Sequence, residues 1–433
     1  MLNVKKINKK NLLLTCYILV LTAVAQGQVD TSFQKKTIAY SDYMEAVAKN
    51  NKAFAAEKFN IPISEAGIEM AKVIPDPEFS AGIFNNDQRN KKMGYGYTTE
   101  LDWTIELGGK RKARVDLAKS ESELSKHILI DYFRNLQADA TLQYLLGIQH
   151  EQLVKLQLNS YEAMSQLAKS DSMRAKLGAI TEVDAKQSKL EASTLWNEAT
   201  SSIGSWKSSL SNLALLMGNS QMGTLLATVG DFSAFHRNFQ LAELIESAQL
   251  NRADLLYALQ NKDVSKKMIK LAKANRIIDL GLVAGVEYNE TAKNETAPSP
   301  SFTQSNIGVR VPLKFSNKRK GELKAAYYTA QQSEVAYSQV ELQVQRDVTQ
   351  AFYNYEATQK QLQQFDSGLL QDAKSILDGK LYSYKRGETS LLEVLTAQRT
   401  YNEVQQHYYE IRFNNAVALV ELERSVGIWD INF

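Results

Sequence analysis

One pattern occurs twice in this sequence, about half a chain apart. The first copy reads GAITEVDAKQSKLEASTLWNEATSSIGSWKSSLSNLALLMG at 178–218, and the second reads GETSLLEVLTAQRTYNEVQQHYYEIRFNNAVALVELERSVG at 387–427. In both copies the bounding glycines are 40 residues apart, and the copies are offset by 209 residues. Such self-similarity indicates a duplicated structural unit, so we expect two similar halves.

Each copy is predicted to contain a turn between two helices. Gly178 and Gly387 are placed to end one helix, and Thr181 and Ser390 to cap the next, which is the usual order at a helical turn. We therefore expect these four residues at the tips of two long helical hairpins. An acidic residue follows each cap at the spacing of a capping box, which stabilises a helix start. The two acids are Asp184 and Glu393.

Proline is confined to a few short parts of the chain, which leaves room for very long helices. The proline-free segments 110–177 and 318–386 are rich in Ala, Gln, Glu, Lys and Leu. Because proline breaks helix interiors, each segment can form one helix, about 100 Å long if it is unbroken. Helices of that length suit a coiled coil or a helical tube rather than a compact globule. The six prolines are Pro62, Pro75, Pro77, Pro298, Pro300 and Pro312.

Apolar and polar residues alternate just before both long helices. The alternating segments are TTELDWTIEL at 98–107 and NIGVRVPLKF at 306–315, with expected partner strands at 79–85 and 280–288. Strands of about ten residues fit a membrane, with lipid on one face and water on the other. An amphipathic sheet on a soluble core is the alternative. In the membrane interpretation the charged side chains face a barrel lumen; they are Glu100, Asp102, Glu106, Arg310 and Lys314.

The number of strands predicts an assembly. Four strands are too few to close a membrane barrel, and an open sheet edge is not tolerated in lipid. Three copies would give one barrel of twelve strands and, from two hairpins each, twelve helices around the same axis. The expected fold class is therefore mainly α with a β-barrel part, in which duplicated helical hairpins form an α-barrel below the shared strands.

A basic triplet stands between strand and helix in both halves. Each cation at a helix N-terminus opposes the helix dipole by about 0.3–1 kcal/mol, so another interaction is expected to favour it. Anionic lipid headgroups would contribute about 1 kcal/mol per basic residue. A solvated run of charge is the alternative. The residues expected at the inner headgroup level are Lys110, Arg111, Lys112, Lys318, Arg319 and Lys320.

The first 27 residues have the pattern of a secretory signal peptide, with four lysines, an apolar stretch and the small residues AVAQGQ. Removing those lysines changes the formal net charge from +3 to −1, so nucleic acid is not an implied partner. The single cysteine, Cys16, lies inside the apolar stretch, whereas lipidation would need it at the end. We expect no lipid anchor and no disulfide in the mature chain.

Motifs of catalytic and metal sites are absent from the sequence. The four histidines, His127, His150, His236 and His407, are scattered, and neither HExxH, G-x-S-x-G nor a glycine-rich phosphate loop occurs. Cysteine ligands for a metal are also missing from the mature chain. We expect neither enzymatic activity nor a cofactor.

Four further stretches are informative together. They are PDPEF at 75–79, ELGGKRKAR at 106–114, and the two turns, LGAITEVDAKQ at 177–187 and RGETSLLEVLTAQ at 386–398. These stretches resemble the TolC family of outer-membrane efflux ducts. The resemblance covers nearly all of the mature chain. Within the family, ELGGKR is similar to the outer-membrane component of cobalt, zinc and cadmium efflux systems, the CzcC-like branch.

The resemblance implies a homotrimer in the outer membrane that extends into the periplasm. It would have a twelve-stranded barrel, a periplasmic α-barrel, and an equatorial belt built from 39–73, 219–240 and the C-terminal tail. The duct would be passive, and a periplasmic adaptor docking at the hairpin tips would connect it to an inner-membrane pump, expected to be of the RND type. The resemblance also implies a periplasmic gate near the turns, at Tyr384, Glu393 and Asp184.

The expected parts follow in a fixed order. They are a signal peptide at 1–27, N-terminal helices at 28–78, a first β-hairpin at 79–107, a first helical hairpin at 108–218, an equatorial region with a return helix at 219–279, a second β-hairpin at 280–315, a second helical hairpin at 316–427 and a tail at 428–433.

Two other classes of protein stay open at this point. A periplasmic adaptor would have one helical hairpin between the halves of a lipoyl-like domain, and a structural coiled coil or adhesin would not need paired strands with charged faces. Within the duct class, the cargo is open among heavy-metal cations, which we favour, small toxic compounds, and proteins secreted by a type I system.

Overall fold

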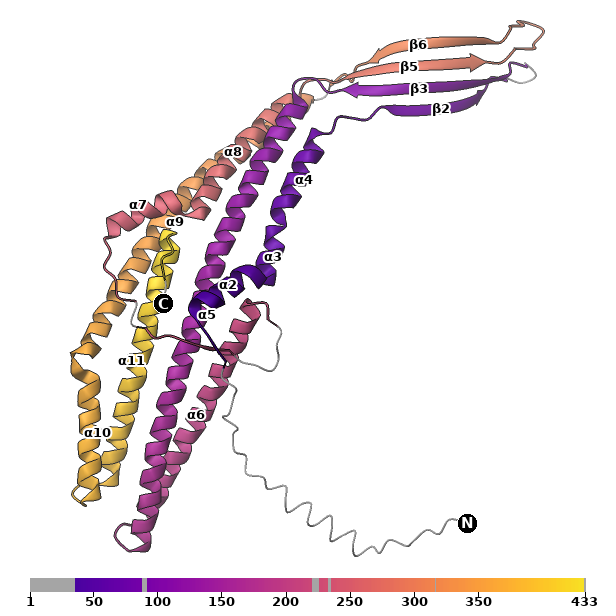
Figure 1. Ribbon diagram of the computed structural model, residues 1–433. Coiled ribbons are helices and arrows are strands. Elements are labelled where there is room, and N and C mark those ends of the chain that lie inside the picture. Colours follow the sequence, from indigo (N-terminus) through magenta and orange to yellow (C-terminus); the bar gives the residue numbers. More distant parts are fainter. Residues whose placement is uncertain (1–35, 88–91, 220–225, 233–234, 316, 432–433) are drawn as a thin grey trace, which may run out of the picture.

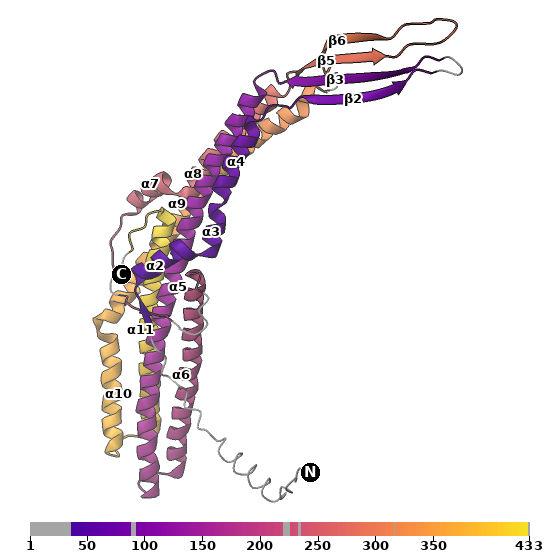
Figure 2. The ribbon, with the colours of Figure 1, turned by 45° about the vertical axis from the view of Figure 1, so that its right-hand side comes forward.

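The computed structural model describes residues 36–87, 92–219, 226–232, 235–315 and 317–431. The predicted signal peptide and Cys16 lie outside the described residues. The molecule is elongated, with a β-sheet at one end and long helices that run away from it (Figures 1 and 2). Over the described residues, no helix combines the length and the apolarity needed to cross a membrane.

The first helical hairpin is continuous, as its sequence predicts. α5 (Lys110–Lys176) has 67 residues and α6 (Glu182–Leu216) has 35, and the two pack along each other up to the turn (Figure 1). The absence of proline and the many strong helix formers explain the length of α5. At about 1.5 Å per residue, α5 alone is about 100 Å long.

The second hairpin differs from the first in one respect. The segment predicted as one long helix is divided into α9 (Lys320–Gln364), a π-helical turn η3 (Phe365–Leu369) and α10 (Leu370–Lys385). The chain then turns and returns as α11 (Leu391–Val426). The physical reason for the break is Gly368, whose φ of +117° lies outside the helical range.

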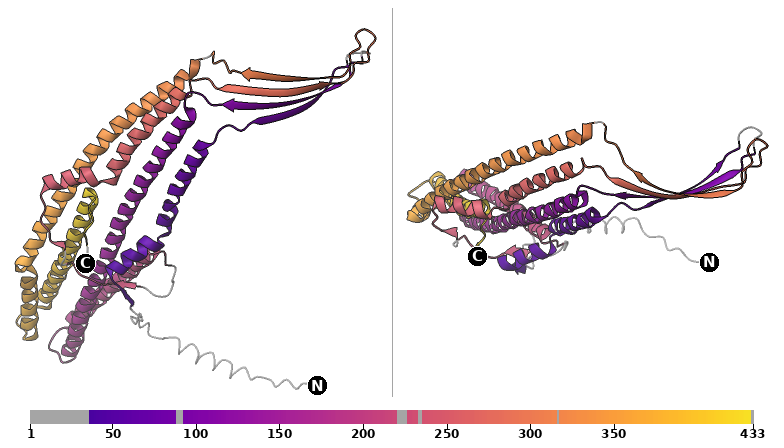
Figure 3. Two further views of the ribbon diagram at one scale, coloured as in Figure 1. Left: turned by 45° about the horizontal axis from the view of Figure 1, so that its top comes forward. Right: turned by 90° about the horizontal axis from the view of Figure 1, so that it is seen from above.

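Two shorter helices extend the helical layer toward the sheet. α4 (Asn60–Lys72) lies along α5, and α8 (Ala253–Ala274) lies between α5 and α9, so that α4, α5, α8 and α9 form one layer (Figure 3). We expected residues 60–72 in the equatorial belt. They lie beside the upper half of α5 instead.

The four long strands form one antiparallel sheet in the order β2-β3-β5-β6. The strands are β2 (Glu78–Asn85), β3 (Tyr95–Ile105), β5 (Leu280–Asn289) and β6 (Phe302–Arg310). The two predicted hairpins are therefore joined through β3 and β5, with Leu101 opposite Ala284. β2 and β6 are the free edges of the protomer's sheet.

The last predicted strand is displaced along the chain. We expected it at 306–315, but β6 ends at Arg310, just before the segment that contains Pro312. Proline has no N–H to donate to a neighbouring strand, which explains the early end. At its other end β6 begins at Phe302, earlier than the alternation suggested.

A belt of short elements surrounds the middle of the helices. It contains α2 (Tyr40–Asn50), α3 (Lys52–Lys58) and α7 (Leu241–Asn251), together with the parallel pair β1 (Lys36–Ile38) and β4 (Leu226–Thr228). The largest group of buried apolar side chains lies here, and includes residues from α2, α5, α6, α9 and α11. This belt is the main core of the protomer.

The two halves share one hydrogen-bond arrangement, in which the N-cap side chain of one helix binds a carbonyl oxygen near the end of another. The side chain of Asn51, the N-cap of α3, donates a hydrogen bond of 2.9 Å to the carbonyl oxygen of Leu216 at the end of α6. The side chain of Arg252, the N-cap of α8, donates one of 3.2 Å to the carbonyl oxygen of Ser425 near the end of α11. Leu216 and Ser425 are 209 residues apart, which is the offset of the sequence repeat.

Candidate periplasmic gate and membrane end

Both hairpin tips have the same backbone geometry. Gly178 has φ +71° and Gly387 has φ +79°, the left-handed conformation that ends many helices. The next residue in each tip donates its N–H to a carbonyl five positions back, at 2.9 Å in both cases. Thr181 Oγ1 then accepts the N–H of Asp184 at 3.1 Å, and Ser390 Oγ accepts that of Glu393 at 3.4 Å. The cap geometry predicted from the sequence is thus present in both turns.

Tyr384 connects the second hairpin to the first. Its hydroxyl donates a hydrogen bond of 3.0 Å to Oδ1 of Asp171 on α5, and both side chains are buried. The guanidinium of Arg174 lies 4.9 Å from the ring centre of Tyr384 and 3.8 Å from Asp171 Oδ1. Burial, with a smaller effect of the Asp171 charge, raises the pKa of Tyr384 to about 12, so the hydroxyl keeps its proton at physiological pH.

The two acidic residues predicted near the gate are engaged in local contacts. The ammonium of Lys380 lies 2.6 Å from Glu393 Oε2, and this hydrogen bond lowers the pKa of Glu393. Asp184 accepts a hydrogen bond of 2.8 Å from the Thr181 hydroxyl. Both acids are at the tips, and the charge of Asp184 contributes to the raised pKa of Tyr384.

Asp171 was missed by the sequence reasoning, although the repeat contains a signal for it. At the offset of 209 residues, Asp171 and Asp184 correspond to Lys380 and Glu393, which form an ion pair in the second hairpin. In the first hairpin the lysine is replaced by a second acid. Burial raises the pKa of Asp171, and its carboxyl group accepts the hydrogen bond from Tyr384 on the other hairpin.

Further contacts join the two hairpins above Tyr384. Arg399 on α11 pairs with Glu191 on α6 through hydrogen bonds of 3.0 and 2.7 Å. Ser160 on α5 donates to Asn402 Oδ1 at 2.8 Å. A small apolar cluster, separate from the belt, contains residues of both hairpins, and its buried members are Met164, Ala168, Ala192, Leu195, Tyr384, Leu391, Val394 and Leu395.

At the other end of the molecule, charged side chains share one face of the sheet. Arg310 on β6 pairs with Asp102 and, at 3.0 Å, with Glu100, both on β3. It reaches them across β5, where Gly281 and Gly285 leave room. The apolar residues of β3 lie on the opposite face.

Two of the predicted lumen residues lie beyond the strands. Glu106 follows β3 and pairs with Arg114 at 2.8 Å. Lys314 follows β6 and donates to the carbonyl oxygens of Asn275 and Ile277 at 2.8 and 2.9 Å. Both belong to the junction between sheet and helices, so the prediction that they face the barrel lumen from the strands is corrected.

The two basic triplets are not structurally equivalent. Lys110 is the first residue of α5, whereas Lys318 and Arg319 form a left-handed turn and α9 begins at Lys320. The left-handed residues before α5 are Gly108 and Gly109. The helices therefore begin 210 residues apart, not at the 208 residues that separate the triplets.

The basic residues also differ in exposure. Lys110 is only 6% exposed, and its ammonium lies 2.5 Å from the carboxylate of Asp279. Arg111 donates to the carbonyl oxygen of Lys72 at 2.6 Å. Lys112, Lys318, Arg319 and Lys320 are exposed. Binding of lipid headgroups by the basic triplets stays a prediction. For Lys110 the ion pair with Asp279 explains the basic residue without lipid.

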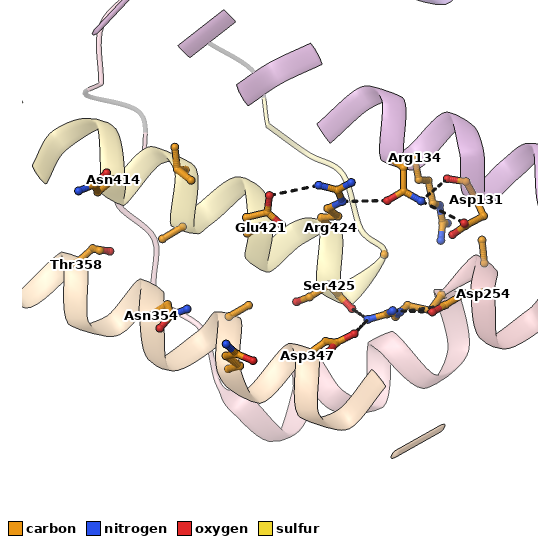
Figure 4. Close-up of a pocket in the computed structure, with 18 residues that line it drawn as sticks. Asp131, Arg134, Asp254, Asp347, Asn354, Thr358, Asn414, Glu421, Arg424 and Ser425 are labelled. Carbon is orange, nitrogen blue, oxygen red and sulfur yellow. Dashed lines mark hydrogen bonds and ion pairs between the residues drawn. The ribbon is translucent and has the colours of Figure 1, made fainter. Parts of the chain in front are cut away.

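A cavity of about 660 Å³, lined by several charged side chains, lies where the end of α11 meets the start of α8 (Figure 4). Arg252 bonds Asp254 at 2.6 and 2.9 Å and Asp347 at 3.2 Å, while Arg424 bonds Asn135 at 3.0 Å. These contacts join α5, α8, α9 and α11. Within the described ranges, no group of three or more His, Cys, Asp or Glu side chains could hold a metal ion.

Comparison with known proteins agrees with this architecture. The family model for outer membrane efflux proteins matches residues 244–428, which include the whole second hairpin. CzcC, the cobalt-zinc-cadmium resistance protein of Cupriavidus metallidurans, is 23% identical over 412 residues, covering 94% of this chain and 95% of CzcC. The outer membrane protein TolC of Vibrio cholerae is 23% identical over 377 residues, covering 82% of each chain.

Solved structures share the fold. CusC, which forms a transmembrane channel, superimposes with a TM-score of 0.74 at 15% identity, over 90% of this chain and 92% of CusC. The CmeC outer membrane channel of Campylobacter jejuni gives a TM-score of 0.74 at 14% identity, over 89% of this chain and 85% of CmeC.

Residues 244–428 match the family of outer membrane efflux proteins, and the fold agrees with that of the CmeC outer membrane channel. The chain is similar to CzcC over almost its whole length and to TolC over 82% of it. The resemblance and the fold class predicted from the sequence are thereby confirmed.

Proposed function

We propose that three copies of this chain form the exit duct of a tripartite efflux system. The observation that carries the proposal is the four-stranded sheet, which has one apolar and one charged face and ends in free edges at β2 and β6. An open edge is not tolerated in lipid, so the β2 edge of one copy pairs with the β6 edge of the next. Three sheets then close one barrel of twelve strands, four from each copy.

The duct is passive in this proposal. An inner-membrane pump, of the RND type, supplies the energy, and a periplasmic adaptor docks at the tips formed around Gly178 and Gly387. Both tips are exposed and project from the end of the molecule farthest from the sheet (Figure 1). The residues that would touch the adaptor include Thr181 and Ser390 as the helix caps.

Tyr384 and Asp171 form the contact that holds the periplasmic end closed. Their hydrogen bond joins the end of α10 to α5, so separating the hairpins breaks it. Glu393 and Asp184 lie at the same end and set the local charge. Because Lys380 pairs with Glu393, three copies of this ion pair would contribute less negative charge at the periplasmic end than three unpaired carboxylates.

We further propose that the cargo is heavy-metal cations. The basis is the similarity to CzcC over 94% of this chain, together with acidic residues on the charged face of the sheet. The duct passes ions without binding them tightly, and it needs no resident metal.

The test is a deletion of the gene in its host, followed by growth in cobalt, zinc and cadmium salts and in a panel of hydrophobic drugs. The proposal expects the inhibitory metal concentration to fall severalfold and to recover with the wild-type gene. Export of accumulated metal from intact cells should slow in parallel. Unchanged metal tolerance with increased drug sensitivity would contradict the proposal that the cargo is metal cations. No change in the efflux of any compound would contradict the proposal that the protein is an exit duct.

A further inference from the structure

The two free edges of the sheet carry opposite charges at the same end. β2 begins with Glu78 and β6 ends with Arg310, so both residues lie at the end of the sheet nearest the helices (Figure 1). Glu78, Asp102, Val283 and Gly308 form one row across the four strands. Because residues in a row share a face and side chains alternate along each strand, Glu78 and Arg310 both lie on the charged face.

Glu78 has no cationic partner in its own copy. Within the part of the chain that the structure describes, its exposed carboxylate forms neither an ion pair nor a hydrogen bond. The residue opposite it in the ladder is a second acid, Asp102, and like charges placed opposite each other are destabilising. Arg310 pairs with Asp102 and Glu100, yet 60% of its side chain is exposed. A guanidinium has five N–H donors, so Arg310 can serve a further carboxylate.

Few registers are open to the seam, by which we mean the pairing of β6 of one copy with β2 of the next. A shift of one residue would bring the charged face of one copy beside the apolar face of the other. Among the remaining registers, one sets Arg310 opposite Glu78 and Thr303 opposite Asn85, so all eight residues of β2 are paired. A shift of two residues in either direction leaves part of β2 beyond the end of β6.

Prolines bound this register at the end nearest the helices. Pro77 would lie opposite Val311, and Pro312 follows one residue later. Proline cannot donate to a ladder, so the pairing would stop where β2 and β6 stop in the structure. On the apolar face the same register sets Phe79 opposite Val309, which are 70% and 62% exposed in the single copy. The seam therefore continues both faces of the sheet.

We propose that the seam forms in this register and that Arg310 binds Glu78 of the next copy across it. The inference rests on the proposed function and deepens it, because it specifies the contact that closes the barrel. Each Arg310 then serves three carboxylates, those of its own Glu100 and Asp102 and that of the next copy's Glu78. Arg310 is thus a positioning residue of the assembly, since it favours one register over the neighbouring ones.

Cysteine cross-linking tests the register. The mature chain has no cysteine once Cys16 is removed with the predicted signal peptide. One in-register pair is Gly308→Cys with Ser80→Cys, and the other is Ile307→Cys with Ala81→Cys. Neighbouring rows of an antiparallel ladder alternate between a wide and a narrow spacing, so the two pairs sample both.

A cross-link between β6 and β2 reports contact between copies only. Within one copy β3 and β5 separate these strands by about 14 Å, whereas a disulfide needs Cα atoms within about 7 Å. The matched controls are Asn306→Cys with Ser80→Cys and Ser305→Cys with Ala81→Cys. In the proposed register their cysteines are displaced by two residues, about 7 Å along the strand.

The proposal expects covalent dimers and trimers on non-reducing gels for at least one in-register pair after outer membranes are oxidised. The two control pairs should stay largely monomeric. Efficient cross-linking of a control pair instead would overturn the register.

The charge contact is tested with Glu78→Gln and Glu287→Gln, each of which removes one carboxylate from the charged face. Glu287 lies on β5, away from both edges, and is the control. Within one copy Glu78→Gln relieves repulsion by Asp102, so it should not weaken the protomer. A dissociation temperature of the trimer that falls by several degrees for Glu78→Gln, measured on gels without prior boiling, therefore reports the contact with Arg310 of the next copy.

Two outcomes overturn the ion pair while the proposed duct stands. One is an unchanged dissociation temperature for Glu78→Gln, and the other is an equal fall for Glu287→Gln. If none of the four cysteine pairs cross-links, the edges of neighbouring copies do not meet, and the proposed barrel is overturned together with this inference.

Discussion

Removal of the Tyr384 hydroxyl should open the duct. In the structure the hydroxyl donates to Asp171 at 3.0 Å, and both side chains are buried; we propose that this contact belongs to the closed state. A hydrogen bond to a charged group contributes about 1.5–3 kcal/mol, and its loss leaves a buried carboxylate with one partner fewer. Since about 1.4 kcal/mol changes an equilibrium tenfold, Tyr384→Phe should raise the ratio of open to closed states by about ten- to a hundredfold per protomer.

Single-channel recording in planar bilayers measures this ratio as the open fraction. Tyr382→Phe is the matched control, because Tyr382 is 61% exposed and its hydroxyl accepts from Arg386 on the surface. Asp171→Asn keeps an acceptor oxygen but removes the charge, so its effect should be smaller than that of Tyr384→Phe. The double variant should show less than the sum of both effects, since the two residues share one contact.

Equal open fractions for Tyr384→Phe and Tyr382→Phe would refute this reasoning. Strict additivity of the Tyr384 and Asp171 variants would also refute it, because the two side chains would then act independently. In either case Tyr384 would be a packing residue of the tip cluster.

Three further changes have defined outcomes. Gly387→Val places a β-branched residue at φ +79°, so it should displace the hairpin tip. Efflux-dependent resistance should fall while the yield of trimer stays near normal. Unchanged resistance would argue against adaptor docking at this turn. Arg252→Met removes the contacts of this side chain with Asp254, Asp347 and the Ser425 carbonyl. It should lower the free energy of unfolding by about 1–3 kcal/mol, which is measured as a lower melting temperature in detergent. An unchanged melting temperature would show that these contacts do not stabilise the protein. Burial raises the pKa of Glu423 from its usual 4.5 to about 8, so the folded state keeps a proton that the unfolded state releases. The free energy of unfolding should therefore fall as pH rises from 4.5 to about 8, and Glu423→Gln should flatten that slope; identical slopes in both proteins would contradict the assignment.

The elements of this fold could be predicted largely from local sequence. Period-two alternation marks the strands, the proline-free segments mark the long helices, and Gly178 and Gly387 mark the turns, because each feature constrains its own part of the backbone. The joining of two hairpins through β3 and β5 is different. It pairs residues nearly two hundred positions apart, such as Leu101 and Ala284, and no local pattern specifies that register.

The candidate gate was predictable only in part. Tyr384 could be proposed from the resemblance, but its partner Asp171 lies on the other hairpin and depends on how the two helices are rotated against each other. The interruption at η3 was equally hidden, since a glycine in a helical pattern is usually tolerated without a break. The Tyr384–Asp171 contact arises from packing between segments, whereas the break at η3 arises from the conformation of one glycine.

The claim that three copies share one duct is tested most directly by the mass of the particle extracted from outer membranes in detergent. Native mass spectrometry of the purified protein should give a mass equal to three mature chains. Omission of detergent should cause aggregation because the apolar face of the sheet is exposed. A monodisperse, water-soluble monomer in the absence of detergent would contradict the account.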